Sequence, residues 1–554
     1  MALPEEQEQE NAEELPQSEV ALPDESAMLD DESAPTGDES LPSEELQEAE
    51  EADSLPEEDL LAEDKFSLLA AGDVAINAEN FPDEIFRNYI LEKIDSDKNG
   101  VLSVSEISRA TFISVSEQPV EDLKGIEYFV NLKSLFVYNC QLTSLDVSHN
   151  AALETLFCGG NALTSLDISN STQLTYLSCY NNSLTSLDIS NSTQLTYLSC
   201  DNNSLTSLDI SKHTQLTSLS CGGNALTSLD ISNSTQLTYL FCYNNSLTSL
   251  DISKNTQLTS LSCDSNSLTS LDISNSTQLT SLSCNNNSLT SLDIGKNKQL
   301  TSLSCNYNSL TSLNIADCGA LINVYVFSNN LEELILSNLP ALKKLNCAFN
   351  KLSFLDLSTC PNIEELSIGY NRFATIDLSP YPYLFSKTGS TGTLNTQEIS
   401  AKVHIVGTRY VLDFKNIVGK ENLHNVSFSA GAEGYDYDAQ SGILVFKYAS
   451  ALYPYITYQY STGNPNKPLM AVRVTLVGLK EHLQDFVTRL YQTAMRRQPD
   501  ASGLNYWVQA LASGKETGTS VVNFFLNSPE FIGQNHNYTT FIKLLYTTVM
   551  GREP

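Results

Sequence analysis

The sequence predicts a multidomain, β-dominated protein organised around a solenoid of 21-residue leucine-rich repeats. The stretch LTSLDISNSTQLTYLSCYNNS begins at Leu163 and returns almost unchanged at Leu184, and related copies run from about Leu132 to about Phe373. Leucines at fixed offsets and a period of this length are typical of leucine-rich repeats. A single copy cannot bury its own leucines, so successive coils are expected to stack into one continuous core.

The charge of the chain is concentrated at its start. The 554 residues carry a formal net charge of −37, and residues 1–65 hold 25 acidic residues and one basic residue, Lys65. A segment with so few apolar side chains cannot offset its ordering entropy, so residues 1–72 are predicted to be a disordered acidic tail. Binding of a partner by this tail is the alternative to a purely solvated spacer.

Composition also excludes several classes of function and partner. An acidic chain lacks the basic surface that binds nucleic acid or anionic membranes. No apolar run approaches the roughly 18 residues that span a bilayer. Met1 is followed by acidic residues rather than by a basic and then an apolar region, so no signal peptide is expected in this sequence.

Residues 73–126 are predicted to form a helical cap that contains an EF-hand-like loop. The loop DSDKNGVLSVSE places oxygen ligands at positions 1, 3, 5, 7, 9 and 12, which are Asp95, Asp97, Asn99, Val101 (through its carbonyl), Ser103 and Glu106. Gly100 occupies position 6, where the loop must turn sharply. The spacing predicts one structural Ca²⁺ ion, and the alternative is a degenerate loop that only caps the solenoid.

Residues 127–383 are predicted to form the solenoid, with about twelve coils. Cysteine replaces the usual apolar strand residue in nine of them: Cys158, Cys179, Cys200, Cys221, Cys242, Cys263, Cys284, Cys305 and Cys347. Val137, Val326 and Ile368 hold the same column, which indicates a buried position. Side chains in a straight column are parallel rather than facing, and they cannot surround a zinc ion. Free buried thiols are therefore expected rather than disulfides or metal ligands.

Two polar columns accompany the cysteines. An asparagine column from Asn161 to Asn371 is expected to satisfy backbone groups where each strand ends. An aspartate column from Asp146 to Asp293 places like charges about 5 Å apart, at a cost of roughly 0.8 kcal/mol per pair even in water. Hydrogen bonds from nearby Ser and Thr would stabilise these carboxylates, and a cation-binding stripe is the alternative.

The repeat with its cysteine ladder resembles the internalin J-like leucine-rich repeat surface proteins of Gram-positive bacteria, over about residues 73–383. This resemblance implies a secreted or wall-attached bacterial protein that binds host or surface ligands and performs no catalysis. The chain departs from that family at its calcium-like cap and in its C-terminal third.

The C-terminal third is predicted to contain two further domains. Short alternating strands over residues 384–479, with a hairpin turn at Gln440-Ser441-Gly442, suggest an immunoglobulin-like β-sandwich. Residues 480–554 are predicted to be helical. RRQPDASGLNYW resembles the GREPDxxGLxYW signature of a bacterial surface-associated domain of unknown function. Because Gly551–Pro554 looks like the start of a second copy, the helical domain is expected to be truncated.

The favoured function is a monomeric binding or adhesion protein at the cell surface or cell wall, with a protein or glycan partner. A structural stalk and the non-catalytic part of a larger surface enzyme are the alternatives. Side chains that flank the core residues of each strand point outward, and aromatic residues are unusual on a Ser-rich surface. The predicted ligand-binding stripe is Phe136, Tyr138, Phe157, Tyr176, Tyr180, Tyr197, Tyr239, Phe241 and Tyr243. Neutral variation among the coils is the alternative explanation for these aromatics.

Overall fold

The computed structural model describes residues 72–386, 393–394, 396–406, 409–428, 434–447, 455–512, 515–534 and 543. The predicted disordered tail, apart from Gly72, lies outside these residues. Most of the last predicted helix, from Tyr538 to Gly551, also lies outside them. No helix in the described part of the chain is long and apolar enough to cross a membrane.

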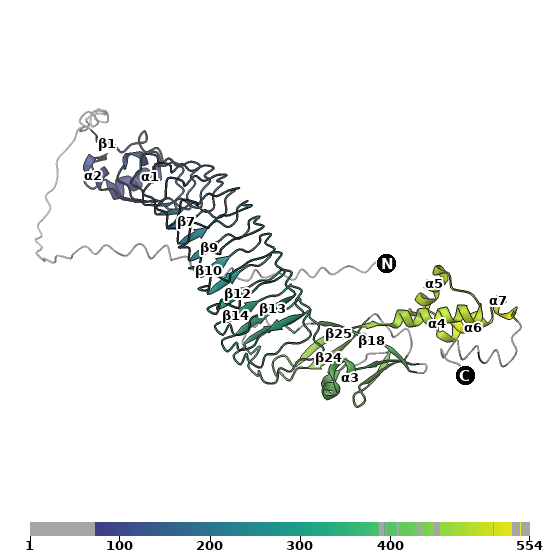
Figure 1. Cartoon of the computed structure of the whole chain (residues 1–554). Coiled ribbons are helices and arrows are strands. Elements are labelled where there is room, and N and C mark those ends of the chain that lie inside the picture. The colour runs from purple at the N-terminus through teal and green to yellow at the C-terminus, as the bar shows by residue number, and fades with distance from the viewer. Residues whose placement is uncertain are drawn as a thin grey trace, which may run out of the picture. The chain divides into compact units, whose positions relative to one another are not determined.

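A parallel sheet organises the solenoid (Figure 1). Among the described residues it has thirteen strands, which follow one another in chain order except that β13 and β15 are left out. Twelve of them occupy one repeat each: β4 (Ser134–Phe136), β5 (Thr155–Phe157), β6 (Tyr176–Ser178), β7 (Tyr197–Ser199), β8 (Ser218–Ser220), β9 (Tyr239–Phe241), β10 (Ser260–Ser262), β11 (Ser281–Ser283), β12 (Ser302–Ser304), β14 (Asn323–Tyr325), β16 (Lys344–Asn346) and β17 (Glu365–Ser367). The predicted solenoid of about twelve coils is therefore confirmed.

The core of the solenoid is a stack of identical layers. The central residue of each strand pairs in register with that of the next strand, as Leu177 does with Leu198, and both of these side chains are fully buried. The cysteine after the strand and the return-side residues Leu184 and Ile189 are buried as well. Each coil contributes the same apolar set, so the hydrophobic core continues from one coil to the next.

The side chains of the asparagine column link neighbouring coils by hydrogen bonds to backbone groups. Asn182 Nδ2 donates to the carbonyl oxygens of Cys158 at 3.0 Å and Cys179 at 3.1 Å, and Asn182 Oδ1 accepts from Leu163 N at 3.0 Å. The same bonds recur as far as Asn371. The predicted structural role of this column is confirmed.

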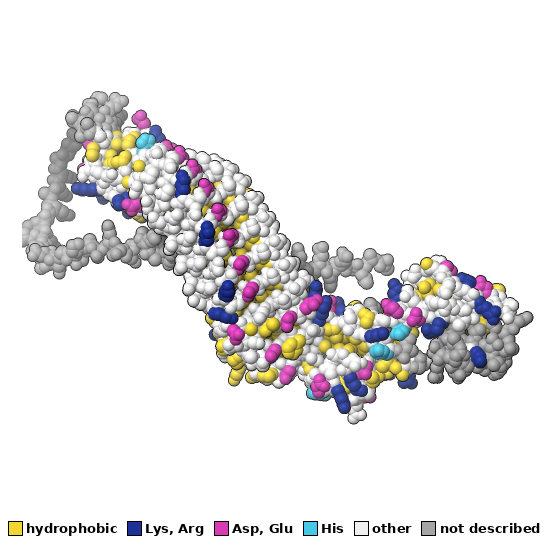
Figure 2. Space-filling view, in the orientation of Figure 1, with side chains coloured by type: hydrophobic (Ala, Val, Ile, Leu, Met, Phe, Trp, Pro, Cys, Tyr) yellow, Lys and Arg dark blue, Asp and Glu magenta, His cyan; other side chains and the backbone are white. Residues whose placement is uncertain are grey.

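The aspartate column forms a series of Asx turns along the solenoid. Asp188 Oδ1 accepts from Ser190 N at 2.9 Å, and hydrogen bonds from Ser190 hold the pKa of Asp188 below its usual value. Equivalent bonds occur from Asp146 to Asp293. Figure 2 shows acidic side chains spaced regularly along the solenoid. The predicted hydrogen bonds to these carboxylates are confirmed, and they account for the column without a cation.

A further buried column was not predicted. It is occupied by polar residues and by two of the three cysteines outside the ladder: Asn150, Ser171, Ser192, His213, Ser234, Asn255, Ser276, Asn297, Cys318 and Cys360. All of these side chains except that of Ser171 bond to the preceding coil, as Asn255 Nδ2 does to Ile231 O and Ser234 O. Cys318 and Cys360 are therefore part of this column rather than a separate thiol site.

The N-terminal cap joins the first coil directly. It contains β1 (Val74–Ala75), α1 (Glu84–Tyr89), the π-helix η2 (Ile90–Ile94), β2 (Val101–Leu102), α2 (Val104–Arg109), β3 (Phe112–Ser114) and the 3-10 helix η3 (Ile126–Tyr128). β3 pairs with β4, so the parallel sheet begins inside the segment that the sequence assigned to the cap. Phe81, Phe86 and Phe129 are fully buried, and they extend the core of the solenoid into the cap.

The chain after the last coil closes the exposed end of the stack. Ile368 N donates to Thr393 O, and Gln397 Nε2 donates to Ile368 O at 2.9 Å, a bond that the next asparagine of the ladder would make. Tyr458 OH then donates to Ala374 O at 2.7 Å. The last apolar layer therefore packs against the β domain instead of facing water.

In the part of the β domain that the structure describes, the strands form two four-stranded sheets, in the orders β18-β25-β24-β21 and β19-β20-β23-β22. Its strands are β18 (Gln397–Lys402), β19 (His404–Val406), β20 (Arg409–Asp413), β21 (Val426–Ser427), β22 (Tyr435–Asp438), β23 (Ile443–Phe446), β24 (Tyr455–Ser461) and β25 (Leu469–Val477), with α3 (Lys415–Val418) and the 3-10 helix η4 (Lys420–Asn425) between β20 and β21. The hairpin predicted at Gln440–Gly442 joins β22 to β23. The immunoglobulin-like assignment stays a prediction.

A separate two-stranded sheet, β13 (Ser312–Asn314) with β15 (Glu333–Ile335), belongs to the solenoid.

The helical domain has its own core. It comprises α4 (Leu479–Ala494), α5 (Ala501–Ala512), α6 (Gly518–Leu526) and α7 (Pro529–Ile532). Val487, Trp507 and Phe525 are among its buried residues. The stretch VVNFFLNSPEFI, read in the sequence as one helix, is two, because Ser528 caps a new helix whose first residue is Pro529.

Candidate functional site

The outer face of the parallel sheet carries a continuous row of stacked aromatic rings. The rings belong to five consecutive strands, from β3 to β7: Phe112, Phe136, Phe157, Tyr176 and Tyr197. Their centroids are separated in turn by 5.4, 4.5, 4.7 and 3.9 Å, and the last pair is almost parallel, at 7°. We call these five residues the aromatic row. Phe112 was not among the predicted stripe residues because its strand lies in the predicted cap.

Stacking hides much of this row from solvent, which corrects the expectation of an exposed stripe. The side chains of Phe157 and Tyr197 are only 2% and 6% exposed. Phe157 lies between the rings of Phe136 and Tyr176, and Tyr197 stacks on Tyr176. Phe136 and Tyr176 are half-buried, and Tyr239, two coils further along, is 36% exposed. Phe157 and Tyr197 therefore support the row, whereas Phe136, Tyr176 and Tyr239 offer surface for contact.

The predicted residues Tyr138, Tyr180, Phe241 and Tyr243 are all half-buried on the same side of the sheet. Phe241 lies in β9, while the three tyrosines lie in the column that follows the cysteine of each coil, which we call column three. The nine predicted stripe residues thus share one face of the solenoid without forming one continuous patch.

Glycines in column three make room for tyrosine rings of the next coil. A Cβ added to Gly159 would lie 2.4 Å from the ring of Tyr180, and one added to Gly222 would lie 2.6 Å from the ring of Tyr243. Contacts this short do not occur, so the two tyrosines require the two glycines. This packing gives Tyr180 and Tyr243 a structural role that the sequence analysis did not assign.

The coils after Tyr180 and Tyr243 place an aspartate in column three, Asp201 and Asp264. Asp201 accepts hydrogen bonds from Ser199 Oγ at 2.9 Å, Ser220 Oγ at 2.6 Å and Gly222 N at 2.8 Å. Burial raises the pKa of Asp201, although the hydrogen bonds from Ser220, Ser199 and Gly222 oppose that rise. Asp264 makes the same set of bonds to its own neighbours.

A second group of exposed aromatics lies at the edge of the sheet in the last coils. The residue that follows column three has a positive φ in each coil, and we call this position the rim column. Most coils place there residues that tolerate this conformation: Asn139, Gly160, Asn181, Asn202, Gly223, Asn244, Ser265, Asn286 and Ser328. Three coils instead carry Tyr307, Phe349 and Tyr370, with φ of 52°, 53° and 55°.

These rim aromatics combine backbone strain with exposure. A left-handed conformation costs an ordinary L-residue about 1–2 kcal/mol. Tyr307, Phe349 and Tyr370 nevertheless remain 48%, 48% and 41% exposed. Stacking of Phe349 on Tyr370, at 4.3 Å, offsets part of that cost. Strain kept at an exposed position is typical of contact sites, so these residues are candidates that the sequence analysis missed. In an alignment of the repeats, these three aromatic residues stand where asparagine is usual, and this difference could have identified them from the sequence.

The predicted calcium loop lies between η2 and α2 and brings its acidic residues together. Ligand oxygens of Asp95, Asp97 and Glu106 lie within 4.8 Å of one another. Lys98 and Gly100 adopt positive φ, which folds the loop back on itself. Val101 and Leu102 pair with β1 in an antiparallel bridge. In this single EF-hand-like loop, β1 is therefore the strand that pairs with the loop residues Val101 and Leu102.

Hydrogen bonds within the loop hold its carboxylates in place. Glu106 Oε1 accepts from Ser96 N at 2.8 Å, and Glu106 Oε2 accepts from Ser103 N at 2.9 Å, which also closes a capping box on α2. Burial alone would raise the pKa of Glu106, but the bonds from Ser103 and Ser96 lower it to about 2. Asn99 Oδ1 accepts from Val101 N at 2.7 Å. The donor set consists of hard oxygen atoms, which suits Ca²⁺.

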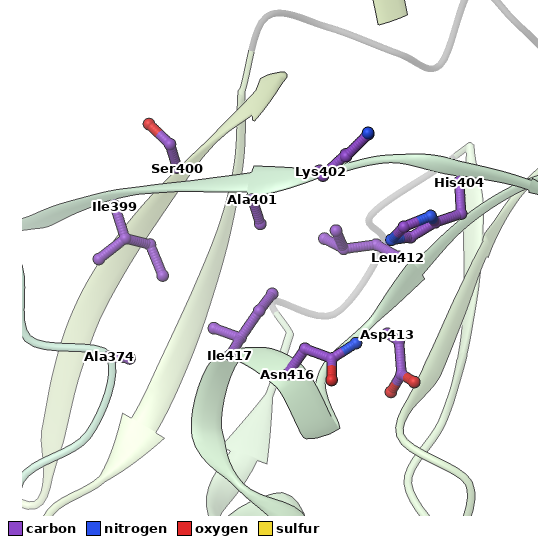
Figure 3. A pocket seen from close by; sticks show the side chains of 10 residues that line it. All are labelled: Ala374, Ile399, Ser400, Ala401, Lys402, His404, Leu412, Asp413, Asn416 and Ile417. Atoms are coloured by element: carbon purple, nitrogen blue, oxygen red, sulfur yellow. The ribbon is translucent and has the colours of Figure 1, made fainter. Parts of the chain in front are cut away.

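The β domain contains a cavity of about 330 Å³ near the junction with the solenoid (Figure 3). Ile399 and Ala401 point toward Ile417, so this part of its lining is apolar. Ser400 and Lys402 point away from that apolar part, to the other side of the strand. The arrangement fits packing between the two sheets, and we assign no ligand to it.

The ladder cysteines are free and buried. Burial raises their thiol pKa values, to about 12 for Cys158, Cys242, Cys305 and Cys347. A protonated thiol is a poor nucleophile, so this column is unsuited to catalysis or metal binding. The predicted state of the thiols is confirmed.

Comparisons with known proteins relate different parts of the chain to different groups. The family described as a domain of unknown function (DUF4214) matches residues 479–535. No curated protein matches the chain. An internalin (InlF) from Listeria monocytogenes is 24% identical, with coverage of 54% of this chain and 98% of its own and a TM-score of 0.45. A leucine-rich repeat protein of Leptospira interrogans is 23% identical, with coverages of 50% and 74% and a TM-score of 0.44.

One solved structure is similar over most of the chain. The functional domain of InlJ from Listeria monocytogenes, which includes a cysteine ladder, shares 27% identity. The similarity covers 73% of this chain and 98% of that domain, with a TM-score of 0.55. The protein is thus similar, through most of its length, to the cysteine-ladder leucine-rich repeat domain of an internalin.

Proposed function

We propose that the protein is a bacterial cell-surface or secreted binding protein whose solenoid docks a protein partner on the outer face of its parallel sheet. The aromatic row and the neighbouring Tyr239 are the observation that carries this proposal. Aromatic side chains that keep part of their surface exposed on an otherwise Ser-rich face are typical of contact sites. Similarity to the functional domain of InlJ supports a binding role, and a glycan partner is the alternative.

The stacking decides which residues a partner can reach. Face-to-face rings present their edges, so the row offers a narrow ridge rather than an open platform. Tyr176 and Tyr239 have the accessible edges, and Tyr197 holds the ring of Tyr176 at 3.9 Å. The partner is therefore expected to contact hydroxyl groups and ring edges across several coils.

The test measures adhesion of beads coated with the full chain to host-cell monolayers, before and after enzymatic removal of the surface glycans. Replacing Tyr176 and Tyr239 with Ser, the residue found at this position in other coils, should reduce retention strongly. Tyr383→Ser is the matched control, because Tyr383 is 82% exposed and lies outside the parallel sheet. Retention equal to that of wild type in the double variant would show that this face is not the docking surface. Loss of wild-type retention after removal of the glycans would identify a glycan partner.

Tyr197 is treated separately because its burial changes the expected result. At 6% exposure and within a stacked pair, Tyr197→Ser removes an aromatic contact worth about 0.5–1.5 kcal/mol beyond its burial. A loss of adhesion in a variant that includes Tyr197 would therefore mix binding with stability. Tyr176 stacks on both Phe157 and Tyr197, so the double variant also loses aromatic contacts, and its thermal melt is measured beside its adhesion. Tyr239→Ser alone leaves the stacked rings of the row in place and serves as the variant that separates binding from stability.

We further propose that the loop from Asp95 to Glu106 holds one structural Ca²⁺ ion. Asp95, Asp97 and Glu106 supply carboxylates, while Asn99, the Val101 carbonyl and Ser103 complete the spacing. The exposed end of a repeat stack is where unfolding can begin, so an ion bound here would stabilise the entire solenoid.

The calcium test compares thermal unfolding with calcium and with a chelator. Free Ca²⁺ at a hundredfold above its dissociation constant should stabilise the cap by about 2.7 kcal/mol. Glu106→Gln should abolish the difference. Glutamine at this position keeps the capping box with Ser103, so the substitution removes the charge and spares the helix cap. Identical melts of wild type in the two buffers would contradict the proposal.

A further inference from the structure

The helical domain contains a cavity of about 420 Å³ between α5 and α6, away from the aromatic row and the calcium loop. Trp507 and Phe524 form its aromatic part, with ring centroids 4.8 Å apart and an angle of 53° between the rings. Glu516, Ser520, Asn523 and Asn527 form its polar part. This volume falls within the range of small-molecule sites.

Helix α6 has one face buried in the core of the domain and a second face along the cavity. Val521 and Phe525 are fully buried in the core of the domain. Ser520, Asn523, Phe524 and Asn527 follow one another at helical spacing and line the cavity. Phe524 remains 56% exposed, although it packs beside Trp507, which is only 9% exposed. The second face is thus an aromatic surface bordered by amides, and the core does not account for it.

The polar groups at this cavity have unused hydrogen-bonding capacity. Within the described residues, the side chains of Glu516 and Asn523 make no hydrogen bond, and Asn527 uses only its Nδ2, which donates to Asn523 O at 2.8 Å. Ser520 is already engaged in the capping box with Thr517. A carboxylate and two amide groups are therefore available to a ligand in this cavity.

We propose that this cavity binds a saccharide, as a second binding site distinct from the sheet face. A sugar ring presents an apolar C–H surface that packs on aromatic rings, and its hydroxyl groups both donate and accept hydrogen bonds. Phe524 offers most of the ring surface and the largely buried Trp507 borders it, Glu516 accepts, and the amides of Asn523 and Asn527 both donate and accept. A phosphate or other anion is disfavoured because Glu516 is the only charged residue among the described residues that line the cavity.

The chain provides its own reporter for this site. Trp507 is its single tryptophan, so intrinsic tryptophan fluorescence comes from the cavity wall alone. The experiment titrates the full chain with glucose, galactose, N-acetylglucosamine, maltose and diacetylchitobiose up to about 10 mM, which covers millimolar dissociation constants. At least one sugar should produce a saturable change in Trp507 emission. Tetramethylammonium is titrated in parallel, because a carboxylate beside aromatic rings also suits an organic cation.

Exposed residues allow variants that leave the fold intact. Phe524→Ala and Asn523→Ala should each weaken the fluorescence response at least tenfold, while the circular dichroism melt stays close to that of wild type. Phe354→Ala is the matched control: Phe354 is 75% exposed and lies on the solenoid, so this variant should respond as wild type does. The proposal is overturned if no sugar changes the emission, if the response survives both cavity variants, or if only tetramethylammonium produces it.

Discussion

The cysteine ladder should make the solenoid unfold abruptly in mild alkali. Burial raises the pKa of all nine ladder thiols, to about 12 for Cys158, Cys242, Cys305 and Cys347. In the unfolded chain a thiol has a pKa of about 8.5. The folded state therefore keeps protons that the unfolded state loses, and stability falls as the pH rises from about 8.5 toward 12.

The size of this effect follows from the number of thiols. Each pKa unit is worth about 1.4 kcal/mol, so at pH 10 one ladder thiol costs the folded state about 2 kcal/mol. Nine thiols together cost about 18 kcal/mol, which exceeds the 5–15 kcal/mol by which folded domains are usually stable. The solenoid should accordingly lose its structure near pH 10, and the destabilisation by the thiols should become small below about pH 7.

The assay follows far-UV circular dichroism and thiolate absorbance during an anaerobic alkaline titration. Replacing Cys221, Cys242 and Cys263 with Val removes three of the nine titrating groups, and Val137 and Val326 show that the column accepts valine. The triple variant should regain about 6 kcal/mol at pH 10, and its midpoint should move to higher pH. Thiols that titrate near pH 8.5 in the folded protein, or equal midpoints for the two proteins, would refute the reasoning.

Three further results are expected. A thiol-reactive dye should label the ladder cysteines only after denaturation, because buried protonated thiols react slowly; mass spectrometry of native protein showing labelled ladder peptides would contradict this. Gly222→Ala should lower the urea unfolding free energy by about 1–3 kcal/mol, and most of that loss should disappear in a Tyr243→Asn background; equal losses in both backgrounds would show that the ring does not need the glycine. Phe349→Asn should leave stability unchanged or raise it by about 1 kcal/mol, since asparagine tolerates the rim conformation, and a drop of more than 1 kcal/mol would argue against strain.

The repeat architecture could be predicted from the sequence because one physical requirement recurs in every copy. Any residue at a given offset meets the same environment, so Val137 and Ile368 in the cysteine column reveal that the column is buried. The same reasoning predicted the asparagine bonds and the Asx turns. The period also placed the outward-facing aromatics on the correct side of the sheet.

What the sequence could not show depends on contacts between copies or between helices. An outward direction does not imply exposure, and Phe157 is buried because a ring on each side covers it. The pairing of Tyr243 with Gly222 links positions 21 residues apart and is visible only as packing. Phe524 lines a cavity because α5 and α6 meet at Trp507, a contact that helical periodicity alone does not specify.

Column three has a consequence for how the solenoid can change in length. Glycine, tyrosine and aspartate follow one another in it as Gly159, Tyr180 and Asp201, and the same order returns three coils later from Gly222. Excision of residues 180–242 would place Tyr243 over Gly159 and recreate an interface that already exists. Loss of a single coil, residues 180–200, would leave Gly159 beneath an aspartate and open a void where the ring had been. Between Gly159 and Asp264, coils should therefore be gained or lost in threes without disturbing this packing, whereas loss of a single coil there should disturb it.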